Sequence, residues 1–594
     1  MIEILKKAKE AHSKKINKIE KIKSLSTPYE ALERLKEGRI KDIDREYFLK
    51  CFGCFYKKSG DYMIRIRTKG SFTPSQAKKI GEIAKKYGND YIDLTTRMQI
   101  ELRFIKEENL YKVLKELESV GISTYQTGVD NFRGILYDPF AGISKESILN
   151  DLILRDKLES EIIENEICSL PRKFNIGICG NIKNTSNVFT QDLGFVLAKR
   201  DGEVGYRVFM GGRVGMIGKD SNVFVSADEG LLLFRGVKAL FKEYGFRDNR
   251  NKNRFAFLLK EVGINNFIKA LEEYLEYEFK KGGEVLTNKK INTSLKEVLI
   301  NSKEAYKFIV PAGIFSGSDM IEAGELADEF GGEIKLSFDQ NFYITNCDES
   351  IRDSYLYKKY FPNPFKNHLI ACAGIKTCAF GVIENKEDAI RLSEKLNKEI
   401  ELNGVIKFHW SACVKGCGIH GVGDFGFEGA KIKTKEGMKQ GVHVFVGGNS
   451  KKEGKKVLSV TLEDVYSHIL PMIKLYNNRE DKNLTYEEWF EKIEISEWAV
   501  AFIMKFNAKF FEFLPTLPLK SKKIEMFEIK ELGNKLFFKL TNIHAFDDLF
   551  SPLKIDTLKN YGLKGGVYEM IDKMVAGKYQ VWSEVLMEME GIDG

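Results

Sequence analysis

The sequence predicts an α+β fold that contains an internally duplicated half-molecule. Residues 62–105 hold two stretches that alternate polar and apolar side chains, as strands do, with a helical pattern between them. A segment with the same order of patterns occupies residues 308–347, about 242 residues further along the chain. This offset is far longer than the period of a solenoid repeat. We therefore expect a duplicated half-molecule rather than a repeat array.

The first copy is expected to run strand, helix, strand, helix. Residues 62–70 alternate and end at a glycine, a residue that interrupts strands. Threonine and proline then open a helix over residues 73–86, because proline fits the first helical turn. Residues 91–105 alternate as one further strand, and residues 107–120 form a helical pattern that ends before a glycine.

The second copy repeats these landmarks. Corresponding pairs are Gly70 with Gly313, Pro74 with Ser318, and LTTRMQIEL at 94–102 with LSFDQNFYI at 336–344. A second repeated segment pairs FMGGRVG at 209–215 with FVGGNSK at 445–451. Two unrelated glycine turns would explain this second similarity alone, whereas the two similarities together favour duplication.

The copies differ in charge. The first carries four arginines at positions where the second has mostly neutral or acidic residues, such as Asp339; they are Arg65, Arg67, Arg97 and Arg103. We expect the first copy to hold an anion and the second to support the fold.

Composition narrows the class of protein. Of the 594 residues, 43% are hydrophobic and 30% charged, which is typical of globular chains. No apolar stretch approaches the ~18 residues of a membrane span, and no signal-peptide core follows the first residues, so we expect a cytoplasmic protein. The formal charge of +8 is too mild to indicate nucleic-acid binding, yet it allows a local basic face for an acidic protein partner.

Four of the nine cysteines fall close together. Cys372 and Cys378 form a C-x5-C pattern, and Cys413 and Cys417 form a C-x3-C pattern further on. The five-residue gap fits poorly with zinc knuckles, whereas irregular spacing suits a [4Fe–4S] cluster whose corners need ligands at several angles. Many neighbouring residues are glycine or alanine, which lets backbone N–H groups approach cluster sulfurs. Zinc binding, or free buried thiols, is the alternative.

The other cysteines are expected to be structural. An odd total in a chain expected to be cytosolic argues against a disulfide framework. Cys51 and Cys54 form a lone C-x2-C pattern without a second pair, so we interpret them as ordinary packed or surface thiols. The remaining three lie in apolar surroundings and are predicted to be core residues: Cys168, Cys179 and Cys347.

Taken together, these motifs resemble the siroheme nitrite/sulfite reductase family, in which siroheme lies against a [4Fe–4S] cluster. The resemblance covers about residues 45–450, in the family's order and with its duplication. It rests on both cysteine patterns and on MIRIR (63–67), LTTRMQ (94–99), GVDNFRG (128–134), LPRKFNI (170–176), FMGGRVG (209–215), FRDNRNKNR (246–254) and VFVGG (444–448). Each segment is weak alone, but the combination is specific.

The resemblance implies a pseudo-two-fold architecture with two ferredoxin-like half-domains and a C-terminal helical extension. We expect an N-terminal helical segment (1–50), a first half-domain (51–125), a siroheme-binding domain (126–300), a second half-domain (301–360), a [4Fe–4S]/siroheme domain (361–450) and an extension (451–594). The aromatic residues of that extension are interpreted as packing, and its role is not readable from the sequence.

The resemblance also implies residue roles. Cys372, Cys378, Cys413 and Cys417 would ligate the cluster, and Cys417 would also bridge to the siroheme iron. Arg65, Arg133 and Lys173 would line the open face of the iron, where a small oxyanion needs charged hydrogen-bond donors. Arginine offers a fixed fork, whereas lysine is a mobile charge suited to relaying protons.

Siroheme has eight carboxylates, so the resemblance implies a basic pocket. Surface salt bridges are the alternative for each arginine. The expected contacts to the cofactor are Arg97, Gln99, Arg103, Arg172, Gly211, Gly212, Arg250 and Arg254.

Two departures from the family pattern bear on geometry and substrate. The usual Pro-Asn between the last two cysteines is replaced by Val414 and Lys415, and Lys415 is expected to pair with a siroheme carboxylate. Asn175 stands where sulfite-type enzymes tend to have lysine, and one positive charge fewer suits nitrite. Asp130-Asn131 is also nitrite-like, whereas Thr377 is sulfite-like, so both anions stay open with nitrite favoured.

The sequence therefore predicts a six-electron reductase that converts nitrite to ammonia or sulfite to sulfide. No G-x-G-x-x-G nucleotide motif is evident, so a separate small acidic protein such as ferredoxin is the expected donor. No nucleic-acid or membrane partner is expected. The rival interpretations are a sulfite reductase, a non-catalytic iron–sulfur electron carrier or redox sensor, and a zinc-stabilised binding protein.

Overall fold

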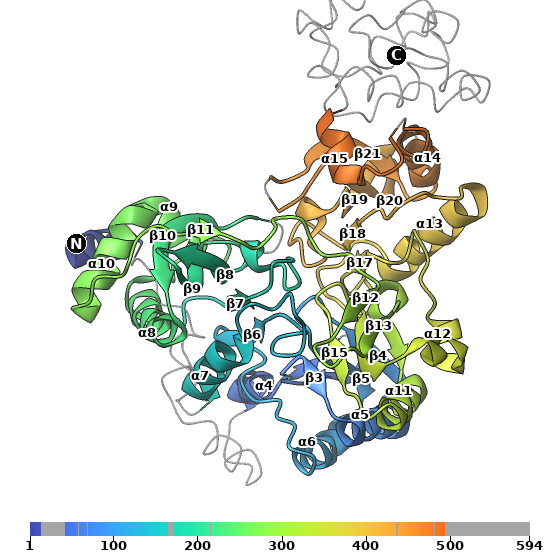
Figure 1. Ribbon diagram of the computed structural model, residues 1–594, viewed down its shortest axis with the longest axis horizontal. Coiled ribbons are helices and arrows are strands. Elements are labelled where there is room, and N and C mark those ends of the chain that lie inside the picture. Colours follow the sequence, from blue (N-terminus) through green and yellow to red (C-terminus); the bar gives the residue numbers. More distant parts are fainter. Residues whose placement is uncertain are drawn as a thin grey trace, which may run out of the picture. The chain divides into compact units, whose positions relative to one another are not determined.

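A computed structural model describes residues 1–12, 42–57, 59–67, 69–163, 170–213, 216–434, 437–450, 452–479 and 481–492. The chain divides into two compact units (Figure 1). The first comprises the described residues within 1–366, 377–379 and 450–453, and the second comprises those within 367–376, 380–449 and 454–492. The C-terminal extension beyond residue 492 and Cys168 lie outside the described residues, so our predictions for them are not tested.

Two five-stranded sheets in the first unit confirm the duplication. One has the order β1-β2-β5-β4-β14, with strands Cys54–Tyr56, Tyr62–Arg65, Ile100–Ile105, Tyr91–Leu94 and Ile314–Ser316. The other has the order β12-β13-β16-β15-β3, with strands Lys296–Val298, Glu304–Phe308, Phe342–Cys347, Ile334–Leu336 and Ser71–Phe72. Each copy donates its outer strand to the other sheet: β14 pairs with β4, and β3 pairs with β15.

The equivalent helices of the two copies pack against each other. Helix α5 (Pro74–Tyr87) begins as predicted, with Thr73 as N-cap in a capping box, and α11 (Gly317–Glu329) begins after Ser316. A Cβ atom on Gly81 would collide with the Gly317 carbonyl oxygen. The close crossing of α5 and α11 therefore depends on these two glycines.

The prediction of a single strand over residues 91–105 is wrong. The chain forms a hairpin instead: β4 and β5 are joined by a tight turn in which Thr95 N–H donates to the Gln99 carbonyl at 3.0 Å. Met98 takes a left-handed conformation there, with φ of 50°. Alternation continues through the turn, so periodicity alone did not detect it. The helix predicted over 107–120 is a short 3-10 turn (Glu107–Asn109) followed by α6 (Leu110–Glu118).

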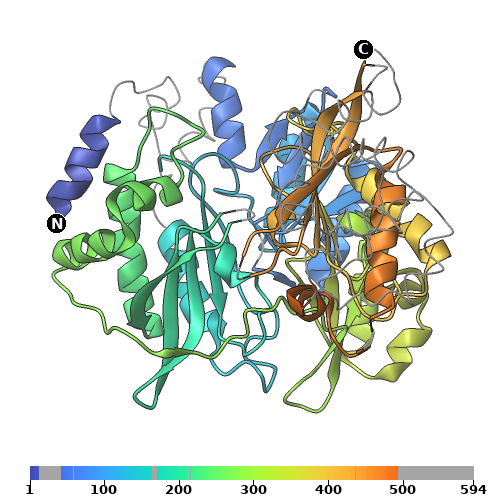
Figure 2. The ribbon, with the colours of Figure 1, turned by 90° about the horizontal axis from the view of Figure 1, so that it is seen from above.

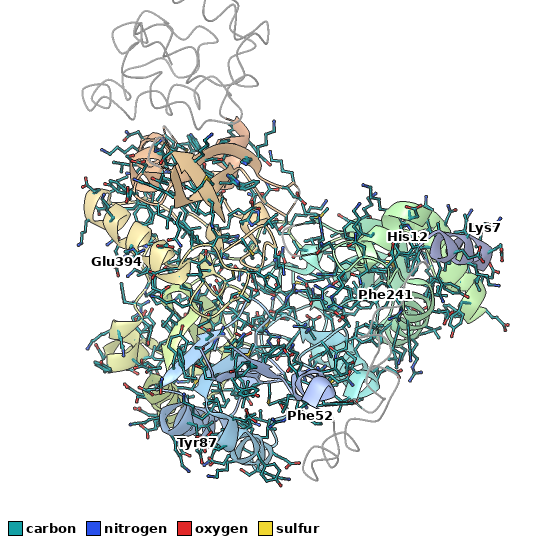
Figure 3. All side chains as sticks on the ribbon, turned by 180° about the vertical axis from the view of Figure 1, so that it is seen from behind. Lys7, His12, Phe52, Tyr87, Phe241 and Glu394 are labelled. Carbon is teal, nitrogen blue, oxygen red and sulfur yellow. The ribbon has the colours of Figure 1, made fainter. Side chains whose placement is uncertain are left out.

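A mixed sheet forms the rest of the first unit. Its order is β10-β9-β8-β7-β6, with strands Lys219–Val225, Glu203–Met210, Leu193–Arg200, Phe174–Cys179 and Phe132–Leu136, and β11 (Glu284–Val285) pairs with β8. Its helices are α7 (Asp151–Ile163), α8 (Ala227–Tyr244), α9 (Phe255–Val262) and α10 (Ile264–Leu275). The N-terminal α1 (Ile2–Ala11) packs on α8, α9 and α10 (Figure 2). Phe241 is buried within this unit, whereas Lys7 is exposed (Figure 3).

The second unit has a sheet of the same topology. Strands β17-β18-β19-β20-β21 span Leu369–Ala371, Phe408–Ser411, Phe425–Thr434, Gly437–Val446 and Lys455–Thr461. As in β6 to β10, the first three strands pair in parallel with one another. The fourth strand pairs antiparallel with the third, and the fifth pairs antiparallel with the fourth. Its helices are α13 (Lys386–Glu399), α14 (Val465–Asn477) and α15 (Tyr486–Lys492).

The two glycine motifs occupy equivalent positions in these sheets. Gly211 follows β9 and donates its N–H to the Asp192 carbonyl at 2.9 Å, and Gly447 follows β20 and donates to the Asp424 carbonyl at 3.1 Å. The repeated segments FMGGRVG and FVGGNSK thus belong to the duplication as well.

The elements outside the sheets are short. They include α4 (Asp42–Cys51) and α12 (Tyr355–Lys359). Cys179 and Cys347 are fully buried, as predicted for core residues, and Cys51 and Cys54 are buried as well. Within the described residues, no helix has the length and apolar character needed to cross a membrane.

Candidate functional site

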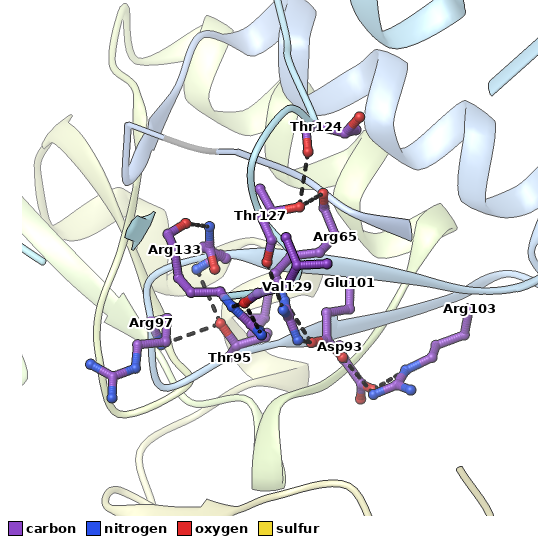
Figure 4. A network of polar contacts seen from close by, with 12 residues as sticks. Arg65, Asp93, Thr95, Arg97, Glu101, Arg103, Thr124, Thr127, Val129 and Arg133 are labelled. Atoms are coloured by element: carbon purple, nitrogen blue, oxygen red, sulfur yellow. Dashed lines mark hydrogen bonds and ion pairs between the residues drawn. The ribbon is translucent and has the colours of Figure 1, made fainter. Parts of the chain in front are cut away.

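Basic side chains of the first unit converge around Arg133 in β6. The charges of Arg65, Arg172 and Arg254 act on its guanidinium, together with the opposite charge of Asp130. The three arginines come from β2, from the segment before β7 and from the residue before α9. Gln99, in the hairpin turn, donates to the Arg133 carbonyl at 3.2 Å. The fold therefore brings together residues that lie far apart in the sequence, and Figure 4 shows Arg65, Arg97 and Arg133 among them.

Arg133 itself makes no ion pair among the described residues. Its Nε and Nη2 both donate to the Val129 carbonyl, at 3.1 and 2.9 Å. Burial and the neighbouring Arg65 lower the pKa of Arg133 to about 9. The Asp130 carboxylate offsets part of this effect, but it forms no ion pair with Arg133. A partly buried cation without an ion pair is a candidate site for an anion.

Arg65 is held by an acid that is itself deeply buried. Its Nε donates to Glu101 at 3.0 Å and its Nη1 to the Thr127 carbonyl at 3.0 Å, while the guanidinium lies over the Phe55 ring. Burial would raise the pKa of Glu101, yet Arg103 and Arg65 hold it well below its usual range. Arg65 is therefore fixed in direction and keeps Nη2 on the same carboxylate.

Arg103 lies behind this pair. Only 4% of its side chain is exposed, and it bonds Asp93 and Glu101, each at 2.6 Å. For Arg103 we had considered a surface salt bridge as the alternative to a cofactor contact. The structure shows a salt bridge, but a buried one. Arg103 supports the acid that orients Arg65.

Two buried aspartates organise the other predicted arginines. Asp130 accepts from Arg172 at 2.9 Å and from Arg250 at 2.9 Å. Asp192 is paired with Arg254 at 2.6 Å and also accepts the Asn175 N–H at 2.8 Å. Each acid fixes cations without neutralising the whole group.

Buried amides in the same region lack partners. Asn131 and Asn175 are 0% and 3% exposed, and neither Nδ2 of these residues nor Oδ1 of Asn131 has a hydrogen-bond partner. Such groups cost roughly 1–3 kcal/mol each unless something pairs with them. Lys173, which precedes β7, is half-buried. These donors and acceptors fit a bound polar group.

The remaining predicted contacts lie near by. Arg97, in the hairpin turn, donates to Gln191. Gly211 has a left-handed φ of 80°, which favours glycine. A Cβ on Gly212 would collide with the Gln191 carbonyl oxygen, so the close approach that the structure shows is to this backbone.

Three of the four clustered cysteines belong to the second unit. Cys372 follows β17, and its Sγ accepts the Ala412 N–H at 3.2 Å and lies 3.6 Å from Asn385 Nδ2. Cys413 follows β18 and is half-buried, and Cys417 is exposed. Donors aimed at a sulfur suit a thiolate ligand.

Cys378 is grouped with the first unit and is half-buried. Among the described residues, no group of three or more His, Cys, Asp or Glu side chains stands at metal-binding spacing. The four-cysteine ligand set therefore stays a prediction. Lys415 stands over the ring of Phe380.

Sequence reasoning missed the residues that hold the arginines. Glu101, Asp192 and Gln191 carry no motif of their own, because their role depends on strand pairing. Lys57 was also missed: burial and Arg103 lower its pKa, and it lies near Arg65 and Glu101. Arg213 sits over the Phe257 ring, and its place in the FMGGRVG motif was the available signal.

Comparisons with known proteins agree with this arrangement. Residues 128–279 match the family described as "Nitrite and sulphite reductase 4Fe-4S domain", and residues 56–120 and 301–352 both match "Nitrite/Sulfite reductase ferredoxin-like half domain". The two half-domain matches are the two copies found above.

Similar curated proteins are named ferredoxin–nitrite reductases. The one from Synechococcus elongatus is 29% identical over 469 residues, covering 74% of this chain and 91% of its own length. The chloroplastic one from Arabidopsis thaliana is 29% identical, covering 74% of this chain and 82% of its own length. The solved structure of Mycobacterium tuberculosis NirA has the same fold, with a TM-score of 0.74 at 22% identity over 81% of this chain and 97% of that one.

Proposed function

This chain belongs to the nitrite/sulfite reductase family, and from that premise we propose that it is a ferredoxin-dependent reductase of nitrite. Reduction of nitrite to ammonium takes six electrons and eight protons and releases two waters. An enzyme for this reaction must therefore hold an anion, deliver protons and receive electrons singly.

One observation carries the proposal. Arg133 is a partly buried cation without an ion pair among the described residues, and the positive charges of Arg65, Arg172 and Arg254 act on it together with the negative charge of Asp130. A small monoanion is the ligand that relieves this repulsion. An electron carrier or a zinc-stabilised binding protein has no use for such a site.

The residues present fit the cofactors of this family, which are siroheme and a [4Fe–4S] cluster. Arg97, Arg172, Arg250 and Arg254 would bind siroheme carboxylates, and the unpartnered amides of Asn131 and Asn175 supply further polar contacts. The four cysteines Cys372, Cys378, Cys413 and Cys417 would hold the cluster. The bound cofactors supply the electron path and the iron at which the anion is reduced.

The protein's own residues bind and orient the anion. Glu101 and the Thr127 carbonyl fix the direction of Arg65, so its charge is placed before the anion arrives. Arg133 attracts the nitrite oxygens, and the mobile ammonium of Lys173 suits proton transfer to an oxygen that leaves as water.

Nitrite is favoured over sulfite by the side chain at position 175. Asn175 adds no charge to the site, and near neutral pH nitrite is a monoanion whereas sulfite is partly a dianion. Its unpartnered Nδ2 is a neutral donor that suits the smaller charge.

A visible absorption spectrum tests the proposal. Purified protein made with siroheme available should show siroheme bands that shift when nitrite is added with reductant, and it should form ammonium. A broad iron–sulfur absorption alone would favour the electron carrier, and zinc without iron would exclude both. Faster turnover of sulfite than of nitrite would reverse the assignment of the substrate.

A further inference from the structure

We propose that Val129 is a positioning residue for the anion site. Its strained, left-handed backbone places its carbonyl oxygen on the Arg133 guanidinium, which fixes that cation in direction before the anion binds. The proposal rests on the proposed function, since it explains how the protein prepares the site for a small anion. Val129 acts through Arg133 and needs no contact of its own with the anion.

Val129 has a backbone conformation that valine rarely adopts. Its φ is 51°, in the left-handed region, and the residue is half-buried. A side chain branched at Cβ is crowded there, so such a residue is a genuine outlier and persists only where the surrounding structure imposes it. Outliers of this kind cluster at binding sites, where the strain is part of the mechanism. The contact that the Val129 carbonyl makes gives this conformation a physical reason.

The Val129 carbonyl accepts the two hydrogen bonds that fix Arg133. The guanidinium donates to it from Nε at 3.1 Å and from Nη2 at 2.9 Å (Figure 4). A carbonyl oxygen is a neutral acceptor, so it orients the guanidinium without cancelling its charge, as a carboxylate would. Nη1 makes no hydrogen bond among the described residues. It is therefore the N–H group that is left to donate to an anion.

The same short segment holds two further arginines through its carbonyls. The Thr127 carbonyl accepts from Arg65 Nη1 at 3.0 Å, and the Tyr125 carbonyl accepts from Arg67 Nη1 at 3.4 Å. Residues 125, 127 and 129 thus each offer a carbonyl to a different arginine. Arg67 is also paired with Glu159, at 3.0 Å from Nη2, and only 2% of its side chain is exposed. It anchors the segment rather than meeting an anion.

The core of the first unit imposes the shape of this segment. Gly128 lies so close to α4 that a Cβ atom would be 1.9 Å from the Lys50 carbonyl oxygen. Gln126 is also left-handed, with φ of 58°, and its N–H donates to the Cys51 carbonyl at 2.7 Å. The Val129 side chain packs on an apolar cluster formed by Tyr47, Phe48, Cys51, Phe52 and Tyr125. Backbone contacts and apolar packing together keep the segment in its strained conformation.

Val129→Pro tests the role of this backbone, because proline fixes φ at about −65° and excludes the left-handed region. The Val129 N–H makes no hydrogen bond among the described residues, so proline removes none. Nitrite is titrated into the protein with its cofactors and followed by the siroheme bands, which measures binding without turnover. We expect the Kd for nitrite to rise at least about tenfold, since misplacing a group by about 1 Å can cost on the order of a hundredfold.

Val129→Asn is the conservative variant, because asparagine tolerates the left-handed region. It should recover nitrite binding to within about threefold of the unmodified protein, since the carbonyl keeps its place. A Kd raised equally in Val129→Asn and Val129→Pro would assign the effect to the lost apolar packing and would overturn the role of the backbone.

Carbon monoxide gives a readout that a merely structural role would not separate from nitrite binding. It is a neutral ligand of reduced haem-type iron, so its affinity should stay within about twofold in Val129→Pro while the Kd for nitrite rises. Equal weakening of both ligands would show that Val129 supports only the fold.

If Val129→Pro does not retain siroheme, a crystal structure of the unmodified protein with nitrite decides the question. A left-handed Val129 with its carbonyl on Arg133, and Nη1 of Arg133 on the anion, would support the proposal. A negative φ at Val129, or an Arg133 guanidinium turned away from that carbonyl, would overturn it.

Sulfite, titrated in the same way, separates this proposal from the proposed function. If the unmodified protein binds and reduces sulfite but not nitrite, and Val129→Pro weakens sulfite binding, the assignment of nitrite fails while the role of Val129 is supported. An unchanged Kd for nitrite in Val129→Pro, in a protein that reduces nitrite, would refute the role of Val129 alone.

Discussion

A buried cation without an ion-pair partner lowers the stability of a fold. Arg133 makes no ion pair among the described residues, although the nearby Asp130 attracts its charge. Replacing it with methionine, which keeps much of its length, removes the repulsion from Arg65 and Arg254. We expect Arg133→Met to raise the free energy of unfolding of the cofactor-free protein by roughly 1 kcal/mol. Nitrite turnover should fall by at least about a hundredfold.

Urea unfolding and nitrite assays check this pair of effects. The charge-retaining Arg133→Lys is the control, and it should recover part of the turnover without the gain in stability. Lower stability together with normal turnover in Arg133→Met would show that Arg133 is structural.

A substitution of the single residue Asn175 is expected to change the preference between nitrite and sulfite. Asn175→Lys adds a positive charge next to Asp192, whose carboxylate accepts the Asn175 N–H at 2.8 Å. We expect the ratio of kcat/KM for sulfite to that for nitrite to rise about tenfold, since a doubly charged anion gains more from an added cation. Asn175→Gln controls for side-chain length. An unchanged ratio in Asn175→Lys would remove position 175 from the specificity argument.

At the scale of the elements, the start of α7 joins the β6–β10 sheet through two fully buried carboxyl groups. Asp151 accepts the Asp138 N–H at 3.1 Å and the Tyr206 hydroxyl at 3.1 Å. Burial and the nearby Asp138 raise the pKa of Asp151 to about 8. The folded state thus retains a proton that the unfolded chain has lost.

This retained proton makes stability fall as pH rises. Between the unfolded pKa near 4 and the folded pKa of about 8, the contribution of Asp151 declines by at most about 1.4 kcal/mol per pH unit. Asp151→Asn should flatten this dependence, as measured by urea unfolding from pH 5 to 8. Asp156→Asn, on the exposed side of α7, should leave the slope unchanged. A steep slope in both variants would assign the proton to another group.

The elements also show where sequence patterns succeed. The start of helix α5 was predicted because Thr73 and Pro74 act locally. The hairpin turn at Thr95–Gln99 was missed, since its left-handed residue is Met98 rather than a glycine. The same turn recurs in the second copy, where Ser337 N–H donates to the Asn341 carbonyl at 3.0 Å and Gln340 has φ of 66°.

The candidate site was only partly predictable for a related reason. Sequence motifs identified the arginines. The acidic residues that form ion pairs with them could be identified only from the folded structure. Asp192 reaches Arg254, which is 62 residues away, and Asp130 reaches Arg250 across 120 residues. Such distances leave no local pattern to recognise.

At the scale of the whole molecule, we predict that one copy of the duplication holds a site and that the other has a structural role. Asp339 stands at the turn position of Arg97, and its carboxylate bonds Lys307 at 2.5 Å, with both side chains 1% exposed. The equivalent Arg97 is half-buried and contacts Gln191. The second copy thus has an internal ion pair at the position where we predict that the first copy binds a ligand.

This difference predicts opposite effects at equivalent positions. Asp339→Leu leaves Lys307 buried without its partner and should lower the free energy of unfolding by about 3–5 kcal/mol, while nitrite turnover per bound siroheme stays the same. Arg97→Leu should change stability by less than about 1 kcal/mol but reduce the siroheme content or raise the KM for nitrite. Urea unfolding, the ratio of siroheme to protein absorbance and the nitrite assay separate these outcomes.

The double variant Lys307→Met, Asp339→Leu should recover much of the stability, because the buried charge is gone. If Asp339→Leu instead lost siroheme while remaining stable, the second copy would be part of the binding site and the division between the copies would be wrong.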